Sequence, residues 1–339
     1  MVHELKHRRL RDAWREWCKT AVLTVLLAIQ AGAPAQSSDY PNRTVTIVAP
    51  AAPGGLYSLF ARLIGNKLEQ RFGHPFIVEN RPGASSIVGS MSVIRAPHDG
   101  YTLLVANSTG LSVNPTMRKN LPYDPVKDFA PIALLGRIPE VLVVNAALPI
   151  HSIADIATYA KSRPGGLSYA SPGAGTGQHL SGFQLAGVLG IEMTHVPYKG
   201  MSPAINDVAG GHIPLMFSPI PFAVPLAQAG KLRMLGVTTA ERVEIIPDVP
   251  PLTEIGVKDF RATTWWMLVA AADTRKDIVE ALHREVRAII ADQGVRKELL
   301  NLGILPVQSP PSEELKRFVQ AEIVRVGEIV TKAGLAGTQ

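Results

Sequence analysis

Residues 167–180, LSYASPGAGTGQHL, hold the part of the sequence that decides the fold. The pattern over 167–170 predicts a short buried strand, and a helix is predicted over 178–189. The turn between them, 173–177 (GAGTG), is rich in glycine. Strands that pass through such a turn into a helix are typical of α/β proteins, whose turns at the carboxyl ends of the strands bind ligands.

Strand-like and helix-like segments alternate on both sides of this stretch. Strands are predicted at 44–49, 76–79, 101–106, 141–145, 167–170, 193–197, 213–217, 232–238 and 263–271. Helices are predicted at 56–71, 85–94, 153–162, 178–189, 203–209, 220–229, 275–291 and 313–331. Because strand, helix and strand follow one another repeatedly, we expect an α/β fold with parallel sheets covered by helices.

The composition is that of a large globular protein. The chain has 339 residues, of which 46% are hydrophobic and 18% charged, and its formal net charge is +6. This composition supports a sizeable core and argues against disorder, and the length indicates about two domains. Much of the basic excess lies in the first 35 residues. No cluster of Lys and Arg with interleaved aromatics remains beyond them, so we expect no nucleic-acid partner.

Residues 1–35 have the pattern of an export signal. Residues 1–19 carry six basic and three acidic side chains, whereas 20–35 carry no charge and end in Ala33-Pro34-Ala35. A basic start, a short apolar stretch and small residues before a cleavage point form a secretory signal. The apolar stretch has about half of the ~20 residues needed to span a bilayer. We therefore expect cleavage near Ala35 and a periplasmic protein; a membrane anchor or a soluble first helix is the alternative.

The common catalytic and metal-binding signatures are missing. The sequence contains no His-Glu-x-x-His, no Gly-x-Ser-x-Gly and no Walker phosphate loop, and the seven histidines outside the export segment have no metal-ligand spacing. The single cysteine, Cys18, lies in the export segment, which leaves no thiol in the mature chain. We therefore expect no catalytic residue, no cofactor and no metal. A serine nucleophile assembled across the fold stays an alternative, because triads join residues that are distant in sequence.

Glycines directly before predicted helices are the strongest chemical signal. They occur in Pro53-Gly54-Gly55, in 173–177 and in 200–203 (GMSP), each between a strand and a helix. A helix N-terminus has unpaired N–H groups and the positive end of the helix dipole, and glycine lets a ligand approach closely. Such an end binds an anion such as a carboxylate. Glycines at these turns are also common for geometry alone, but three such loops in one exported chain favour carboxylate binding.

Several segments around these loops closely resemble a known family, the substrate-binding proteins of tripartite tricarboxylate transporters, or Bug family. The matching segments are Pro53-Gly54-Gly55, 78–84 (VENRPGA), 99–104 (DGYTLL), 121–131 (LPYDPVKDFAP), 167–171 (LSYAS), 178–180 (QHL), 195–200 (HVPYKG) and 229–233 (AGKLR). The likeness extends over residues 40–333, in order and with few insertions.

The resemblance implies a type II periplasmic-binding-protein fold, with two α/β lobes and a ligand cleft between them. We expect lobe 1 to comprise 36–141 and 255–339, and lobe 2 to comprise 142–254. The family's ligands are small organic acids that it delivers to membrane permease subunits. The resemblance therefore implies a monomeric receptor without enzymatic activity. Two alternatives stay open, an exported hydrolase or lyase that uses a loop serine, and a periplasmic sensor that signals to a kinase.

The resemblance also implies a set of binding residues on five loops. They are Gly54, Gly55, Tyr57 and Ser58; Asn107, Ser108 and Thr109; Gly175, Thr176, Gly177 and His179; Ser202 and Pro203; and Ser218. Trp265 or Trp266 reaches the cleft or packs in the core. Two positions depart from the family's usual pattern, because Ser58 replaces an Asp and Phe217-Ser218 replaces a more polar pair. The loss of the carboxylate at Ser58 predicts a ligand that is not an amino acid, such as an uncharged, aromatic or dicarboxylic acid. Both departures fit a ligand with a more apolar body.

Overall fold

The computed structural model describes residues 39–258, 260 and 262–338. The predicted export signal at 1–35 lies outside the described residues. The strands are β1 (Val45–Ala49), β2 (Phe76–Asn80), β3 (Thr102–Asn107), β4 (Phe129–Asn145), β5 (Leu167–Ser171), β6 (Met193–Pro197), β7 (Leu215–Pro219), β8 (Leu232–Val237) and β9 (Thr263–Ala271). The helical segments are α2 (Leu56–Phe72), η1 (Ala84–Ser86), α3 (Ile87–Ile94), η2 (Thr109–Val113), α4 (Asn114–Met117), α5 (Ile153–Lys161), α6 (Gly177–Leu189), α7 (Met201–Ala209), α8 (Ile220–Gln228), α9 (Lys276–Ala291), α10 (Gln293–Asn301) and α11 (Ser312–Lys332).

The strands of the described chain pair in the order β2-β1-β3-β9-β4-β7-β5-β6, and β8 also pairs with β4. Strands β1, β2 and β3 are parallel to one another, as are β5, β6 and β7. Each of these parallel groups alternates with helices, as expected for strand–helix–strand units. The predicted α/β fold is confirmed.

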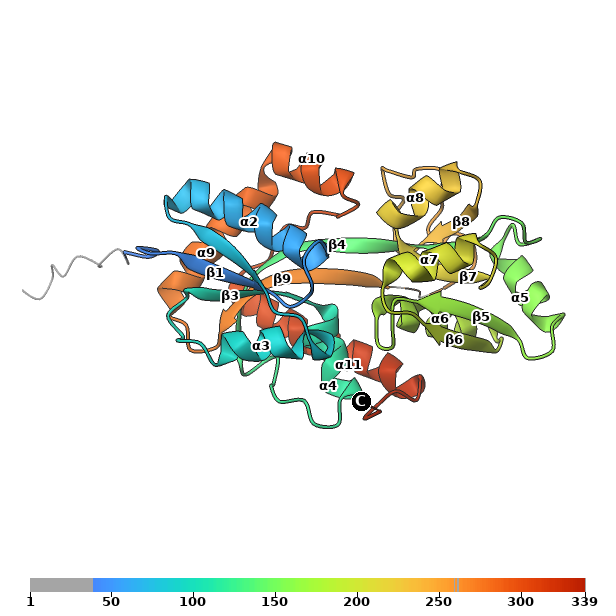
Figure 1. Ribbon diagram of the computed structural model, residues 1–339, viewed down its shortest axis with the longest axis horizontal. Helices are drawn as coiled ribbons and strands as arrows, with labels where there is room; N and C mark the ends of the chain where they lie inside the picture. Colours follow the sequence, from blue (N-terminus) through green and yellow to red (C-terminus); the bar gives the residue numbers. More distant parts are fainter. Residues whose placement is uncertain (1–38, 259, 261, 339) are drawn as a thin grey trace, which may run out of the picture. The chain divides into compact units, whose positions relative to one another are not determined.

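Strand β4 joins the two groups. Its residues 129–139 pair with β9, its residues 140–144 pair with β7, and its residues 141–145 pair with β8. Figure 1 shows β4 running from the part of the sheet that contains β1–β3 to the part that contains β5–β7. Both β4 and β9 are antiparallel to their neighbours. The expected parallel sheets are found in the two groups, and β4 and β9 add antiparallel pairs because they are not linked to their neighbours by short strand–helix–strand crossovers.

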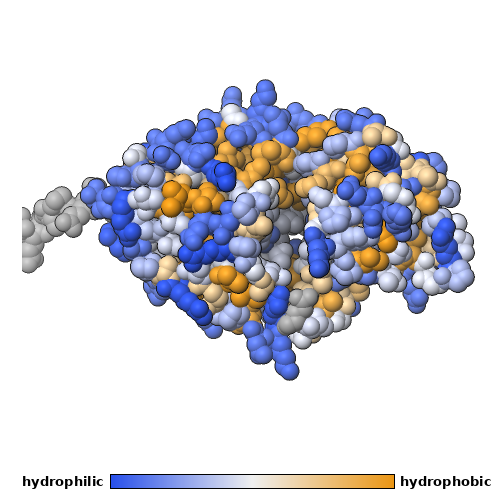
Figure 2. Space-filling view, in the orientation of Figure 1, coloured by the Kyte–Doolittle hydropathy of each residue, from blue (hydrophilic) through white to orange (hydrophobic). Residues whose placement is uncertain are grey.

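Alternation along β4 separates two apolar clusters. Leu142 and Val144 belong to a core cluster with β5 and α5, whereas Val141 and Val143 belong to a cluster with α7 and α8. Successive side chains of a strand point to opposite faces of the sheet, so one strand supplies both cores. A third cluster, with Trp265, covers the part of the sheet around β3 and β9. On the face in Figure 2, hydrophilic residues cover much of the outer surface, and hydrophobic residues gather between α10 and α8.

Helix α6 packs directly on β5 at Gly182. A Cβ atom at this position would lie 2.1 Å from the ring of Tyr169, whereas a Cβ at Gly187 of the same helix would meet nothing within 4 Å. Tyr169 is buried, and its hydroxyl donates to the carbonyl of His179 at 3.0 Å. Gly182 therefore sets how closely the start of α6 approaches the sheet.

We expect Gly182→Val to lower the free energy of unfolding by about 1–3 kcal/mol, because the added side chain overpacks a buried contact. Gly187→Ala is the matched control on the same helix, and we expect it to raise stability by about 0.5–1 kcal/mol. Urea unfolding followed by circular dichroism measures both. Equal effects of the two variants would contradict the packing role of Gly182.

Candidate ligand-binding site

The glycine-rich turn before α6 is held by its own side chains. Thr176 caps the helix, since its Oγ1 accepts from the N–H of His179 at 3.4 Å and donates to the carbonyl of Gly173 at 2.8 Å. Gly175 has φ +75°, and its N–H donates to Nδ1 of His179 at 3.1 Å. A positive φ favours glycine, so this turn requires the residue that the sequence places there.

The first N–H groups of α6 are not used by hydrogen bonds within the described part of the protein. Among the described residues, neither the N–H of Gly177 nor that of Gln178 has an acceptor. A Cβ at Gly177 would lie 3.0 Å from Oε1 of Glu140 and 3.1 Å from Oγ1 of Thr264. The end of the helix therefore combines unpaired donors with the positive end of the dipole, an arrangement that suits an anion.

His179 supports this turn and is itself buried. Its ring stacks on His195, with centroids 3.6 Å apart and an interplanar angle of 9°. Nε2 of His195 lies 2.6 Å from Oγ of Ser171, at the end of β5. Burial lowers the pKa of both histidines to about 4, and for His179 the neighbouring His195 adds to the effect. Both rings are therefore neutral at pH 7, and Nδ1 of His179 can accept from Gly175. The sequence placed His179 against a ligand, whereas its side chain lies under the turn.

The loop before α2 lies at the end of β1. Gly54 has φ +90°, and Gly54 and Gly55 are exposed. The ring of Tyr57 meets that of Trp266 edge to face at 4.5 Å, and burial raises the pKa of Tyr57. Ser58 is buried, and its Oγ accepts from Nδ2 of Asn80 at 2.6 Å. Ser58 is therefore bonded within the protein.

The loop after β3 is closed by Asn107. Its Oδ1 accepts from the N–H groups of Thr109 and Gly110 at 3.1 and 3.3 Å, which starts the η2 segment. Asn107 pairs in register with Trp266 of β9. The buried Nε1 of Trp266 has no partner among the described residues, whereas that of Trp265 donates to Glu322 at 2.8 Å. Of the two tryptophans, Trp266 is thus the one beside the predicted residues.

The remaining predicted residues lie at the start of α7 and the end of β7. Ser202 and Pro203 are exposed. Ser218 is fully buried, and its Oγ donates to the carbonyl of Pro219 at 3.1 Å and lies 3.9 Å from Sδ of Met201. The start of α7 and the end of β7 therefore lie together, with the hydroxyl of Ser218 turned inward.

A small cavity brings together two of the predicted loops. Ser108 and Gly177 line it, with Glu140 of β4, Thr264 of β9 and Arg325 of α11, and its volume is ≈ 40 Å³. That is about the room of one water molecule. Glu140 is the residue that sequence reasoning missed. A single Glu within an apolar strand gave no signal of its own, because its partners on α6 are about 40 residues away in sequence.

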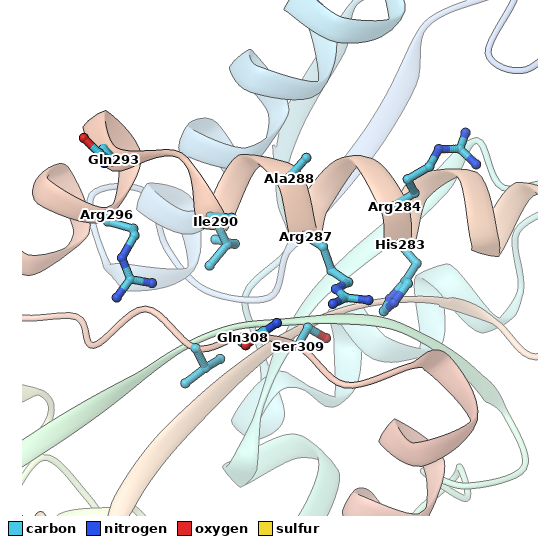
Figure 3. A pocket seen from close by; sticks show the side chains of 11 residues that line it. His283, Arg284, Arg287, Ala288, Ile290, Gln293, Arg296, Gln308 and Ser309 are labelled. Carbon is cyan, nitrogen blue, oxygen red and sulfur yellow. The ribbon is translucent and has the colours of Figure 1, made fainter.

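Another pocket, of ≈ 710 Å³, lies between α9, the start of α10 and residues 307–309. Figure 3 shows Arg287, Arg296 and His283 pointing to the same side, toward Gln308 and Ser309. None of the predicted binding residues lines it. No group of three or more potential metal ligands is found among the described residues.

The topology is that of a class of protein, the periplasmic solute-binding proteins. R. palustris Rpa4515 with adipate is 34% identical, with a TM-score of 0.79 over 88% of this chain and 99% of that one. The periplasmic binding protein BugD is 32% identical, with a TM-score of 0.76 over 88% and 99%. MatC (Rpa3494) from Rhodopseudomonas palustris with bound malate is 32% identical, with a TM-score of 0.74 over 86% and 100%.

The chain belongs to the tripartite tricarboxylate transporter family of receptors, TctC, whose profile matches residues 60–335. A protein from the tcbD-tcbE intergenic region of Pseudomonas sp. (strain P51) is 36% identical over 88% of this chain and 89% of its own length. The resemblance found in the sequence is therefore confirmed. None of the described helices combines the length and the hydropathy of a membrane-spanning segment.

The stacked histidines predict a loss of stability in acid. Their pKa values are about 4 in the folded chain, against an ordinary value of 6.5. A lowered pKa contributes stability above pH 6.5 that is lost as the pH falls through 4, because unfolding then takes up protons. We expect His195→Gln to reduce the fall in unfolding free energy between pH 6.5 and 4, measured by urea unfolding. The exposed His151, replaced by Gln in the same way, is the control, and an unchanged pH dependence in His195→Gln would contradict this account.

Proposed function

We propose that this protein is a periplasmic receptor that captures a small carboxylate and delivers it to the membrane permease subunits of a tripartite tricarboxylate-type transporter. The observation that carries the proposal is the start of α6, where the N–H groups of Gly177 and Gln178 have no protein acceptor among the described residues. Two unpaired donors at the positive end of a helix match the two oxygens of one carboxylate.

Family membership supports the same ligand class. Two solved relatives carry dicarboxylates, adipate in Rpa4515 and malate in MatC. A dicarboxylate has a second charged end, which the loops at Gly54 and Ser202 can meet, since α2 and α7 also begin there. The binding set proposed for this chain keeps Gly54, Gly55, Tyr57, Asn107–Thr109, Gly175–Gly177, Ser202 and Pro203, and the proposed role of His179, Ser58 and Ser218 is to hold these loops in place.

Of the two departures from the family pattern, only the one at Ser58 still bears on the choice of ligand. Phe217 is fully buried and stacks on Phe260 at 5.4 Å, so its ring packs in the core. Ser58 lacks the carboxylate that its position usually carries in the family, and that change still favours a ligand without an ammonium group. We therefore propose a dicarboxylate or another amine-free organic acid.

Delivery requires export and a change of shape. We propose that residues 1–35 direct export and are removed near Ala35. We also propose that 36–141 with 255–339 and 142–254 act as two lobes of a monomer that close on the ligand, and that the chain passes between them within β4 and again between 254 and 255. Binding selects a closed state only through contacts made by both lobes, and hinge closure of this kind is common in periplasmic binding proteins.

One contact bears on the alternative of a serine hydrolase. Oγ of Ser171 and Nε2 of His195 lie 2.6 Å apart, as in a nucleophile–base pair. Ser171 is fully buried, however. Its Oγ already donates to the carbonyl of Gly173 at 2.9 Å and accepts from the N–H of Gly173 at 3.1 Å. This hydroxyl therefore serves the turn, and the pair supports a structural role.

Isothermal titration calorimetry with adipate, malate and an amino acid tests the proposal. We expect saturable binding of at least one dicarboxylate, and no product when the bound ligand is recovered. Turnover of the ligand would favour the alternative of an exported hydrolase or lyase. If none of the organic acids tested binds, the proposed receptor function is contradicted.

A pair of variants tests the start of α6. We expect Gly177→Asp to weaken dicarboxylate binding tenfold or more, because the new carboxylate occupies the free donors and repels the ligand. Gly187→Asp adds the same charge near the other end of α6, in open space, and should retain binding. Thermal unfolding confirms that both variants are folded. Equal affinities in the two variants would place the ligand elsewhere.

A further inference from the structure

We propose that Glu140 is a positioning residue that sets the charge beneath the start of α6, so that a carboxylate ligand binds there only while the Glu140 side chain is uncharged. The inference rests on the proposed function, because it assumes that the ligand is an anion. It concerns a residue of the central strand that none of the predicted loops contains.

Glu140 stands where β4 changes partners. Pro139 pairs with Thr263 of β9, and Glu140 pairs with Pro219 of β7. The N–H of Glu140 donates to Oγ1 of Thr238 at 3.0 Å, and its carbonyl accepts from the N–H of Thr238 at 2.9 Å. Both backbone hydrogen-bonding groups of Glu140 are therefore held by Thr238, which fixes the point from which the side chain starts.

The carboxyl group of Glu140 lies directly beneath α6. The residue is 1% exposed. Nε2 of Gln178 donates to Oε1, and Oγ of Ser181 donates to Oε2, each at 2.7 Å. A Cβ at Gly177 would lie only 3.0 Å from Oε1. The carboxyl group is thus held by the same turn of helix that presents the unpaired N–H groups of Gly177 and Gln178.

A charge on this carboxyl would oppose a bound anion. Two like charges a few ångströms apart in a poorly solvated site repel strongly, and the helix end would then already have its own counter-charge. Burial, the dominant cause, raises the pKa of Glu140 to about 8, although the hydrogen bond from Ser181 lowers it. The neutral form therefore dominates at pH 7, and the donors of α6 remain available to the ligand.

Among the described residues around Glu140, it is the one that changes charge between pH 7 and 9. Arg325 of α11 lines the same cavity, and its guanidinium bonds Glu322 at 2.8 Å, which raises the pKa of Arg325 and lowers that of Glu322. The pKa values of His179 and His195 are about 4, so both rings are neutral throughout this range. Beside Glu140, Pro219 of β7, Thr238 directly after β8, and Thr263 and Thr264 of β9 carry no charge.

The test is the affinity for adipate and malate by calorimetry from pH 6.5 to 9.5, in the wild type, Glu140→Gln and Ser181→Ala. Both ligands are fully ionised throughout, because ordinary carboxyl groups titrate near pH 4. We expect the wild type to bind about tenfold more weakly at pH 9 than at pH 7, the ratio that ionisation near pH 8 gives. The affinity of Glu140→Gln for each ligand should change by no more than about twofold between pH 7 and pH 9. Ser181→Ala should move the midpoint to higher pH, because it removes a donor that favours the charged form.

Thermal unfolding over the same range supplies a readout without ligand. The pKa of Glu140 is higher in the folded chain than the ordinary 4.5, so its contribution to stability is complete below pH 4.5 and is lost as the pH rises to about 8. The melting temperature of Glu140→Gln relative to the wild type should therefore increase between pH 5 and 8 and then level off.

The outcomes separate the two proposals. If the wild type and Glu140→Gln bind dicarboxylates with the same pH dependence, or if neither shows a pH dependence, the role of Glu140 is overturned and the receptor function still stands. Absence of binding for every dicarboxylate at every pH would overturn the receptor, and the role of Glu140 with it. A melting temperature difference that does not change between pH 5 and 8 would also contradict the inference, since it would mean that Glu140 is ionised throughout.

Discussion

The structure depends on the length of β4 and on the change of its partners at Glu140. A strand of 17 residues pairs first with β9 and then with β7 and β8, so its backbone groups are satisfied on both sides of the change. Nearly all of its residues are buried, and their alternation supplies two apolar clusters in the second part of the sheet. The group β1–β3 reaches β4 through the antiparallel strand β9, whereas the group β5–β7 pairs with β4 directly, through an antiparallel β7–β4 pair.

A polar network on this apolar strand links the sheet to the proposed ligand site. Glu140 binds Gln178 and Ser181 of α6, and α6 begins at the turn that Thr176 and His179 hold in place. A buried network in which every member has a partner fixes one arrangement, because an unpaired member would be costly. The free N–H groups of α6 are therefore directed by contacts that come from the strand beneath them.

Much of the fold could be predicted from local pattern. The strand at 193–197 and the strand at 263–271 agree with the observed bounds, and the other predicted elements agree within a few residues. The first part of β4 was missed, because Pro131 and Pro139 with two irregular pairings obscure its alternation. Helix α10 was also missed. The antiparallel pairing of β9 could not be predicted, since strand direction depends on partners far away in sequence.

The sequence by itself determined the α/β class, the family and the loops that precede α2, α6 and α7, because these follow from short-range periodicity, glycine positions and long matching segments. Only the tertiary structure decided which side chains of those loops are available. It turned His179, Ser58 and Ser218 inward and brought Glu140 beneath α6, because their hydrogen-bond partners come from other strands and helices. The physical reason is that burial and pairing of a polar group are properties of its neighbours in space, which a linear pattern does not contain.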